Sequence, residues 1–563
     1  MTVAMASGTD KSDLPLWHRA QPGSRKRLVD RGTDRDVAHI SVDWGSPRVV
    51  TATTPSLQVV VMPTMFPGSP VRESLLKSLS DLGEECSPVF WQSWFVYPHT
   101  GVAELRPNQW NFSAITPLLH DMMVALGPSR ELALQFGTWP QWMVAGSRGE
   151  AWKSLDIPDR IDQQVWGAKC GCNNAPTADP CVPRNLTELA EYYGRFVAFY
   201  TAGGFTDDTG TFHEGFKYNI PWFEYGNEME YGQTPELYTQ QHDAVASAVR
   251  AVQPGIKFLG LGADQDEYSL GNLDFFEHFL NASNHARGAP NAAAIDYHFY
   301  SGGGLSRTDP TSYVKMFAEG DKFFDTAAEV DSLRRRLSPQ TRVFLKEIGT
   351  ILPGDNAATE SPIPAVFWSA SAAYWVYVYA RLATLGTDVV SMSQFTGGVP
   401  QCTPLLPNGC ADAQDAATCR CVGSNFASVT MVRWDDGRRT ARYWALQLLV
   451  QELGSRVKTF FATQCKNAGC GNASTPGANT TLLVQGLRVP NAGEMANDGI
   501  AKVLVVNKID ELQTVSLGVD FLNTTYRCID SRNPFGAPRS LTYRGAAVQI
   551  GGWAVCIFGA TSG

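Results

Sequence analysis

The sequence predicts an α/β fold, a (β/α)8 TIM barrel with an additional antiparallel β-sandwich domain. From about residue 57 to residue 395, apolar strand-like runs alternate with amphipathic helical runs, a pattern that indicates a parallel sheet. The alternation counts to eight strand–helix units over about 340 residues, which suits a barrel with insertions. Beyond about residue 440, short alternating runs rich in Thr, Val, Asn and Gly replace this pattern and predict the sandwich.

Each expected barrel strand is a short run rich in β-branched or aromatic residues. In chain order these strands are expected at 57–63, 88–98, 131–142, 220–228, 256–262, 293–301, 342–350 and 388–395. Helices are expected between them where apolar residues recur every three or four positions, and one further helix precedes the sandwich. The expected helices cover 71–83, 115–127, 187–204, 234–254, 273–283, the surroundings of 328–339, a stretch from about residue 365, and 442–454.

The chain divides into four expected parts. Residues 1–30 are an N-terminal extension, 31–56 are expected to add a strand to the sandwich because of their Thr and Val content, 57–440 form the barrel, and 441–563 form the sandwich. The extension lacks the apolar core of a signal peptide. No run of 18 or more uninterrupted apolar residues occurs in the sequence, so no membrane span is expected.

The composition indicates a large packed core. Of the 563 residues, 44% are hydrophobic and 11% are aromatic, which is typical of a globular protein rather than a disordered one. The formal net charge is -9, and the longest basic run is the three arginines at 334–336. Nucleic acid is therefore not an expected partner.

The cysteines and the glycosylation sequons indicate an oxidising compartment. The chain has 12 cysteines, most of them clustered in loops rich in Pro, Gly and Asn, and we expect disulfides. Zinc is the alternative for the Cys-x-Cys pairs, but the usual C-x-x-C pairing with matching histidines is absent. We therefore expect a secreted or extracellular glycoprotein, with no signal peptide evident in this chain. N-linked glycans are expected at some of six sequons, at Asn111, Asn185, Asn281, Asn472, Asn479 and Asn523.

Two glutamates stand at the ends of expected strands. Glu228 ends the fourth strand in "IPWFEYGNE", and Glu347 follows "RVFLK" in the seventh. Catalytic residues of TIM barrels lie at the C-terminal strand ends, where these two strands can face each other across the mouth. Two carboxylates about 5 Å apart are what retaining glycoside hydrolysis requires, one as acid and one as nucleophile, without a metal or an organic cofactor. The flanking Glu224 and Glu230 are expected to be supporting or solvated.

With these residues the chain resembles the retaining glycoside hydrolases of clan A, and family 39 in particular. The motifs "GNE" on the fourth strand and "KEIG" on the seventh carry the resemblance. The run "IDYHFYS" on the sixth strand and the segment 428–449 after the eighth add to it. The similarity covers roughly residues 57–560, and in that family a sandwich flanks the barrel as the tail here would allow.

The resemblance implies a role for each matching residue. Glu228 is the implied general acid and base, Glu347 is the implied nucleophile, and Asn227 is the implied hydrogen-bond partner of the sugar 2-hydroxyl. His298 and Tyr300 are two positions apart on a strand, so they point the same way and are expected to line the sugar site. Tyr300 is suited to donate to the carboxylate of Glu347 and to keep it ionised.

Other positions are less specific. Trp139 and Trp142, after the third strand, are interpreted either as core packing or as aromatic walls of sugar subsites. Gln394, at the end of the eighth strand, is placed to touch ligand. One position departs from the family, because Lys346 stands where the relatives often have Asn. Alternation along the strand is expected to turn Lys346 away from Glu347; the alternative is an irregular strand end, which would let the Lys346 ammonium act on the nucleophile.

Two other functions are weighed against glycoside hydrolysis. The same fold can serve as an inactive carbohydrate-binding or structural glycoprotein, although the presence of both glutamates argues against it. A serine hydrolase would need a G-x-S-x-G elbow, and none follows an expected strand.

The carbohydrate substrate is expected to be an oligosaccharide, a polysaccharide or a glycoconjugate. A neutral sugar is favoured, because no Arg or Lys can be assigned to a sugar carboxylate. Exo-action is expected because the Cys-bearing insertions at 165–185 and 400–425 follow the third and eighth strands, where they would narrow the mouth.

Overall fold

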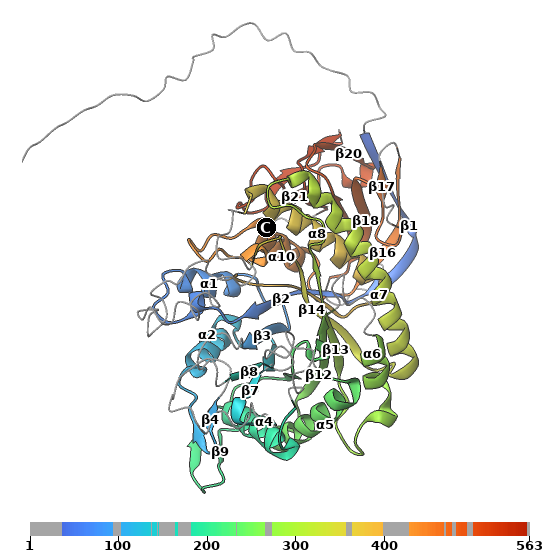
Figure 1. The fold of residues 1–563 in the computed structure, drawn as a ribbon. Coiled ribbons are helices and arrows are strands. Elements are labelled where there is room, and N and C mark those ends of the chain that lie inside the picture. The colour runs from blue at the N-terminus through green and yellow to red at the C-terminus, as the bar shows by residue number, and fades with distance from the viewer. Residues whose placement is uncertain are drawn as a thin grey trace, which may run out of the picture.

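The computed structural model describes residues 37–93, 103–136, 138–143, 145, 164–166, 182–231, 233–264, 273–355, 363–397, 427–466, 469–475, 480–491, 499–545 and 547–559. These residues form a closed barrel of parallel strands, helices around it, and a second, mostly antiparallel sheet (Figure 1). The predicted fold class is confirmed. The N-terminal extension, the sequon at Asn479 and seven cysteines lie outside the described residues; those cysteines are Cys170, Cys172, Cys181, Cys402, Cys410, Cys419 and Cys421.

Eight parallel strands close the barrel, and each overlaps an expected strand. Almost all their residues are buried, because the strands face the barrel interior on one side and the helices on the other. In barrel order the strands are β2 (Thr54–Val60), β3 (Val89–Ser93), β6 (Leu132–Phe136), β11 (Trp222–Tyr225), β12 (Lys257–Asp264), β13 (Ala294–Ser301), β14 (Arg342–Thr350) and β15 (Val389–Met392).

The helices follow the expected pattern, and α7 begins earlier than its sequence pattern indicates. Its first half contains Gly320, where a Cβ would lie 3.0 Å from the Tyr374 ring, so the glycine lets α7 and α8 approach closely. None of the described helices is long and apolar enough to cross a membrane. The helices are α1 (Arg72–Ser80), α2 (Thr116–Leu126), α4 (Leu186–Thr201), α5 (Pro235–Val252), α6 (Leu273–Leu280), α7 (Lys315–Leu337), α8 (Ala365–Leu385) and α10 (Ala441–Glu452).

The second sheet joins the two ends of the described chain. Its first strand, β1 (Val37–Thr51), pairs antiparallel with β16 (Lys458–Lys466) and parallel with β20 (Gln513–Leu517). Residue 51 ends β1 and β2 begins at residue 54, so the chain passes directly from this sheet into the barrel. The remaining strands are β17 (Cys470–Gly471), β18 (Leu482–Val489), β19 (Ile500–Asn507), β21 (Thr525–Ile529), β22 (Arg539–Thr542), β23 (Val548–Ile550) and β24 (Val555–Phe558).

Alternate residues of the second sheet belong to two different hydrophobic clusters. On β19, Val503 and Val505 pack inside the sandwich, whereas Leu504 and Val506 belong to the large cluster that continues into the barrel. Because side chains alternate between the two faces, one face of the sheet packs inside the sandwich and the other packs against the barrel domain. Charges support the docking, because Lys502 Nζ on β19 lies 2.6 Å from Glu452 Oε2 at the end of α10.

Short ribbons and two disulfides complete the described fold. Three two-stranded ribbons are formed by β4 (Glu104–Arg106) with β5 (Gln109–Trp110), β7 (Thr138–Pro140) with β8 (Gln164–Trp166), and β9 (Gly204–Thr206) with β10 (Phe212–Glu214). Disulfides join Cys465 to Cys470 and Cys528 to Cys556, as expected for loops and strands of the sandwich. Cys86 is a buried free thiol.

Candidate active site

The barrel interior is apolar towards one end and polar towards the other. Near the N-terminal ends of seven strands, one apolar side chain from each forms a layer of Phe90, Ala133, Trp222, Leu259, Ala294, Phe344 and Val389. Two residues further along six of these strands, the buried positions are polar, namely Gln92, Gln135, Glu224, Asp296, Lys346 and Ser391. Period-two alternation places both sets inside, and the polar set lies towards the end where TIM barrels carry their active sites.

Lys346 is the cation of this polar layer. Its ammonium lies 2.8 Å from Glu224 Oε1 and 3.1 Å from Asp296 Oδ2, and its side chain is fully buried. Burial opposes the charged form, but the charges of Asp296 and Glu224 outweigh burial and raise the pKa of Lys346 above its usual value. The ammonium therefore stays charged inside the barrel.

The expectation that Lys346 and Glu347 point to opposite sides is wrong. Phe344 pairs with Asp296 on β13, but the next pair joins His298 to Glu347. Between these two pairs β14 advances by three residues and β13 by only two. The extra residue shifts the alternation by one. Phe344 and Lys346 face inwards by regular alternation, and the shift turns Glu347 to the same side, with its Oε1 only 4.0 Å from Lys346 Nζ.

Glu228 lies three residues beyond the end of β11. Its backbone has φ of 50°, in the left-handed region that few non-glycine residues adopt, and its N–H donates to the Gly262 carbonyl oxygen at 2.8 Å. This conformation, anchored on β12, gives the residue a fixed place at the barrel mouth. Glu228 and Glu347 are each 5% exposed.

The two glutamates meet around His298. One carboxylate oxygen of Glu228, one of Glu347 and one ring nitrogen of His298 all lie within 4.8 Å of one another. Nδ1 of His298 is 3.3 Å from Glu228 Oε1, and Nε2 is 3.5 Å from Glu347 Oε1. The sequence places these residues on three separate strands or strand ends, and the closed barrel brings them together.

Glu347 is held by two hydrogen-bond donors. The Tyr300 hydroxyl donates to Oε2 at 2.6 Å, and Gln58 Nε2 donates to Oε1 at 2.5 Å. Together the two bonds fix the positions of both carboxylate oxygens. Tyr300 also lies 2.6 Å from Ser393 Oγ, which in turn donates to Gln58 Oε1 at 2.7 Å, so the two donors are themselves fixed.

His298 is a buried imidazole surrounded by carboxylates. Burial alone would lower its pKa, but the charge of Glu347 and hydrogen bonds to Asp296 and Glu228 raise the pKa well above 6.5. The ring is therefore a second positive charge beside the two glutamates. His298 is fully buried, as a core histidine would be, and its ring nitrogens also lie 3.3 Å and 3.5 Å from carboxylate oxygens of Glu228 and Glu347.

Neither of the flanking glutamates is freely solvated. Glu224 is fully buried, and burial raises its pKa to about 8 even though the charge of Lys346 opposes that shift. Glu230 is partly buried, and its Oε1 accepts a hydrogen bond from the Asp264 N–H at 2.6 Å. Burial and the neighbouring carboxylate of Glu228 raise the pKa of Glu230 to about 8.

The remaining predicted residues are buried at different places. Asn227 Oδ1 accepts from Gln135 Nε2 at 2.9 Å, which ties it to the polar layer. Gln394 donates its backbone N–H to the Val429 carbonyl at 2.9 Å and is 2% exposed. Trp139 is fully buried and its ring stacks near Tyr225 with centroids 6.4 Å apart.

Trp142 is buried and contacts Glu104 and Arg184. Its indole N–H donates to the Glu104 carbonyl at 3.1 Å, and the Arg184 guanidinium lies over its ring at 4.9 Å. The described contacts of Trp139 and Trp142 are thus those of packed side chains.

Sequence reasoning missed the glutamines of the first three strands. Gln58, Gln92 and Gln135 each stand alone in an apolar strand, in "LQVVV", "VFWQS" and "LALQF". All three are buried, and Gln58 donates to both Gln92 and Glu347. A single amide inside an otherwise apolar barrel strand was the available signal, since a buried polar side chain must find a partner.

Solved structures share this fold. The chain is similar to a GH51 arabinofuranosidase from Xanthomonas axonopodis pv. citri, with 12% identity, a TM-score of 0.56, and coverage of 92% of this chain and 99% of that one. An α-L-arabinofuranosidase from Thermotoga maritima gives 12% identity, a TM-score of 0.54, and coverage of 92% and 99%. A glucosidase from Croceicoccus marinus gives 14% identity, a TM-score of 0.51, and coverage of 92% and 98%.

No family model matches the chain, and no curated protein matches it. At these levels of identity, the likeness to solved structures shows a shared fold, a TIM barrel with a sandwich domain.

Replacing Lys346 with Met is expected to lower the free energy of unfolding by about 3–5 kcal/mol, because the change leaves buried carboxylates without their cation. Urea denaturation followed by circular dichroism measures this loss. The matched control is Lys77→Met, whose ammonium pairs with Asp81 at 2.9 Å but is 72% exposed, and which should cost less than about 1 kcal/mol. Equal losses in the two variants would show that Lys346 does not balance the buried charges.

Replacing Glu230 with Gln is expected to change how stability depends on pH. A carboxyl group whose pKa is about 8 when folded and about 4.5 when unfolded stabilises the fold fully below pH 4.5 and loses that contribution as the pH rises to 8. The variant keeps the acceptor for the Asp264 N–H but cannot titrate. Its Tm should therefore fall less than that of the wild type between pH 5 and 8, and parallel curves would contradict the assignment.

Proposed function

We propose that this protein is a retaining glycoside hydrolase. The observation that carries the proposal is the approach of Glu228, Glu347 and His298, whose side-chain donor atoms lie within 4.8 Å of one another. Retaining enzymes hold their carboxyl groups about 5–5.5 Å apart, whereas inverting enzymes need about 6.5–9.5 Å to admit a water molecule. The clan A sequence motifs support the same reading, and membership of family 39 is its finer form.

In the first step, a carboxylate oxygen of Glu347 attacks the anomeric carbon while Glu228 gives its proton to the glycosidic oxygen. The bond to the leaving group breaks as the ester bond to Glu347 forms. In the second step, Glu228 takes a proton from water, and the water oxygen displaces Glu347 from the sugar. Two inversions return the starting configuration, and both glutamates recover their initial protonation states.

The surrounding side chains suit these roles. Tyr300 and Gln58 hold the Glu347 carboxylate in place through hydrogen bonds, and the charges of His298 and Lys346 lie beside it. Asn227 uses its side-chain oxygen to accept from Gln135, so its amide N–H₂ is the group assigned to the sugar 2-hydroxyl. Preorganised donors of this kind stabilise charge without rearranging during the reaction.

The proposed substrate is a neutral, chain-terminal sugar of a glycan or glycoside. Lys346, whose ammonium lies 4.0 Å from Glu347 Oε1, is fully buried and bound to Glu224 and Asp296. It is therefore assigned to charge balance, and no sugar carboxylate is assigned a partner. The names of the similar structures, an arabinofuranosidase and a glucosidase, also refer to neutral sugars.

Secretion and N-glycosylation complete the proposal. Asn111 and Asn185 are exposed, and in both the side-chain oxygen accepts a hydrogen bond from the chain itself. These bonds use the side-chain oxygen and not the amide nitrogen, the atom that carries a glycan. Asn472 is less suited, because its amide nitrogen donates to the Thr463 carbonyl at 3.2 Å.

Glu347→Gln and Glu228→Gln are expected to lower kcat on nitrophenyl glycosides by about 10²–10⁴-fold or more, since each removes a group that forms or breaks bonds. Azide should restore turnover of the Glu228 variant and yield a glycosyl azide of retained configuration. Proton NMR of the first product formed by the wild type should show the anomer of the substrate.

The control for these variants is Glu277→Gln, which changes an exposed glutamate paired with Arg336 and should leave kcat unchanged. Wild-type activity in both site variants would overturn the mechanism. Sugar binding without hydrolysis by the wild type would instead identify an inactive carbohydrate-binding protein on this fold.

Three kinds of substrate check the sugar and the mode of action. Neutral nitrophenyl glycosides are expected to be cleaved, and uronides are expected to resist. A soluble polysaccharide should release monosaccharide while the viscosity of its solution falls slowly. A rapid fall in viscosity, with no cleavage of short substrates, would identify endo-action. Preferred cleavage of a uronide would contradict the assignment of a neutral sugar.

A further inference from the structure

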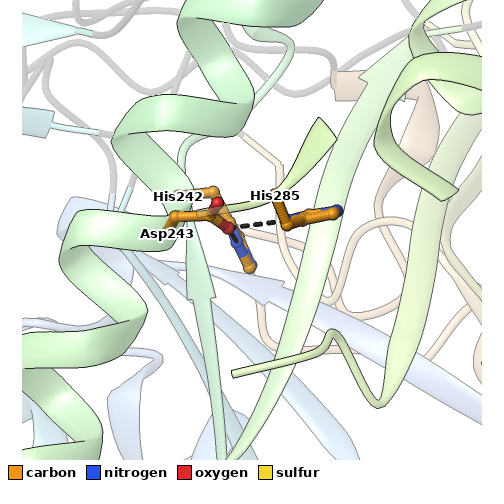
Figure 2. A group of neighbouring side chains, drawn as sticks. All are labelled: His242, Asp243 and His285. Atoms are coloured by element: carbon orange, nitrogen blue, oxygen red, sulfur yellow. Dashed lines mark hydrogen bonds and ion pairs between the residues drawn. The ribbon is translucent and has the colours of Figure 1, made fainter. Parts of the chain in front are cut away.

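A cluster of two histidines and one aspartate lies away from the two glutamates. His242 and Asp243 are neighbours on α5, and His285 follows α6 and the short 3-10 helix Ala282–Asn284. Figure 2 shows His285 approaching the α5 pair from the adjacent segment of the chain. One donor atom from each of the three side chains lies within 4.8 Å of the other two.

Asp243 and His285 already connect the two segments. Nδ1 of His285 lies 2.7 Å from Asp243 Oδ1, and the Ala286 N–H donates to Asp243 Oδ2 at 2.6 Å. The other ring nitrogen of His285, Nε2, lies 2.6 Å from the Phe279 carbonyl oxygen, to which it donates. A histidine that binds a metal through one nitrogen usually donates its other N–H to a carbonyl or carboxylate, and His285 has this arrangement.

His242 supplies a buried imidazole with no hydrogen bond. It is 1% exposed, and neither ring nitrogen has a hydrogen-bond partner among the described residues. Its Nδ1 lies 3.6 Å from Asp243 Oδ1, beyond an ordinary hydrogen bond. Aromatic rings surround it, with Phe279 at 4.9 Å and Phe258 at 6.3 Å between centroids. A buried polar group without a partner requires an explanation, and a bound ion supplies one.

We propose that His242, Asp243 and His285 bind a divalent transition metal, with Zn²⁺ as the best match. Two imidazoles and one carboxylate are ligands that Zn²⁺ accepts, and a water molecule completes four-coordination. With bonds of about 2.0–2.1 Å, tetrahedral ligand atoms lie about 3.3 Å apart. The present separations of 3.6 Å and 2.7 Å from Asp243 Oδ1 bracket that value, so small side-chain rotations suffice.

Metal binding would exchange a proton for the ion. Zn²⁺ takes the place of the hydrogen that His285 Nδ1 shares with Asp243, and that proton is released to solvent. Nε2 keeps its hydrogen and its bond to the Phe279 carbonyl. The His285 side chain is 12% exposed, whereas the other two are 1% and 3% exposed, so the ion enters beside His285. The bound ion links α5 to the segment after α6.

The site differs from the group of donors formed by Glu228, His298 and Glu347. There, the Lys346 ammonium lies 4.0 Å from Glu347 Oε1 and repels a second cation. Among the described residues, neither Asp243 nor His285 forms an ion pair with a Lys or an Arg, so no such side chain competes with a metal ion there. The metal proposal is therefore independent of the proposed glycosidase function, and either can fail without the other.

The test uses the full-length protein after chelation and dialysis, titrated with Co²⁺ and with Zn²⁺. We expect one Co²⁺ per chain with the d–d absorption of a four-coordinate site of nitrogen and oxygen ligands, and without thiolate charge-transfer bands. Zn²⁺ at about 100-fold its Kd should raise Tm by on the order of 3 °C. Absence of Co²⁺ binding, or bands that show cysteine ligands alone, would overturn the proposal.

Two variants remove ligands in different ways. His242→Phe should fit the surrounding aromatic rings and leave the Tm of the metal-free protein unlowered, while weakening Co²⁺ binding at least tenfold. His285→Gln removes the second imidazole and should weaken binding in the same way. The matched control is His278→Gln, since Nδ1 of His278 lies 3.8 Å from Glu236 between the same two helices but has no second histidine. The single variants Glu228→Gln and Glu347→Gln should also bind Co²⁺ with the affinity of the wild type. Unchanged Co²⁺ affinity in His242→Phe would refute the site.

Discussion

A positive charge buried inside a closed barrel must be neutralised by its own neighbours, and the polar end of this barrel is built around that constraint. Lys346 cannot reach water, so Glu224 and Asp296 surround its ammonium. The same charge lies 4.0 Å from Glu347. Its position therefore links the stability of the barrel interior to the electrostatics of the two glutamates at the mouth.

The link depends on one extra residue in β14. Without it, a side chain at position 347 would face the helices whenever 346 faced the interior. The shift between the pairs that β14 forms with β13 brings both side chains inside. A strand irregularity thus supplies what regular alternation forbids, two consecutive charged residues on the interior side of one strand.

Much of this fold could be predicted from the sequence, because strand and helix periods reflect burial directly. The alternation over 57–395 gave all eight strands, and the strand ends singled out Glu228 and Glu347. The placement of Glu347 on the same side as Lys346 could not be obtained this way, since a bulge leaves no mark in a pattern of period two. The partners of Gln58 and Asp296 were equally hidden, because they depend on which strands meet when the barrel closes.

The pairing of β1 with β16 has a consequence for the order of folding during synthesis. Residue 51 at the end of β1 lies opposite residue 458, more than 400 residues later in the chain. The ribosome releases β1 first. This strand therefore stays unpaired until the whole barrel and β16 have been synthesised. Closing so long a loop is slow, and an unpaired strand edge invites wrong contacts meanwhile. The second sheet therefore cannot close around β1 until β16 and β20 have been made.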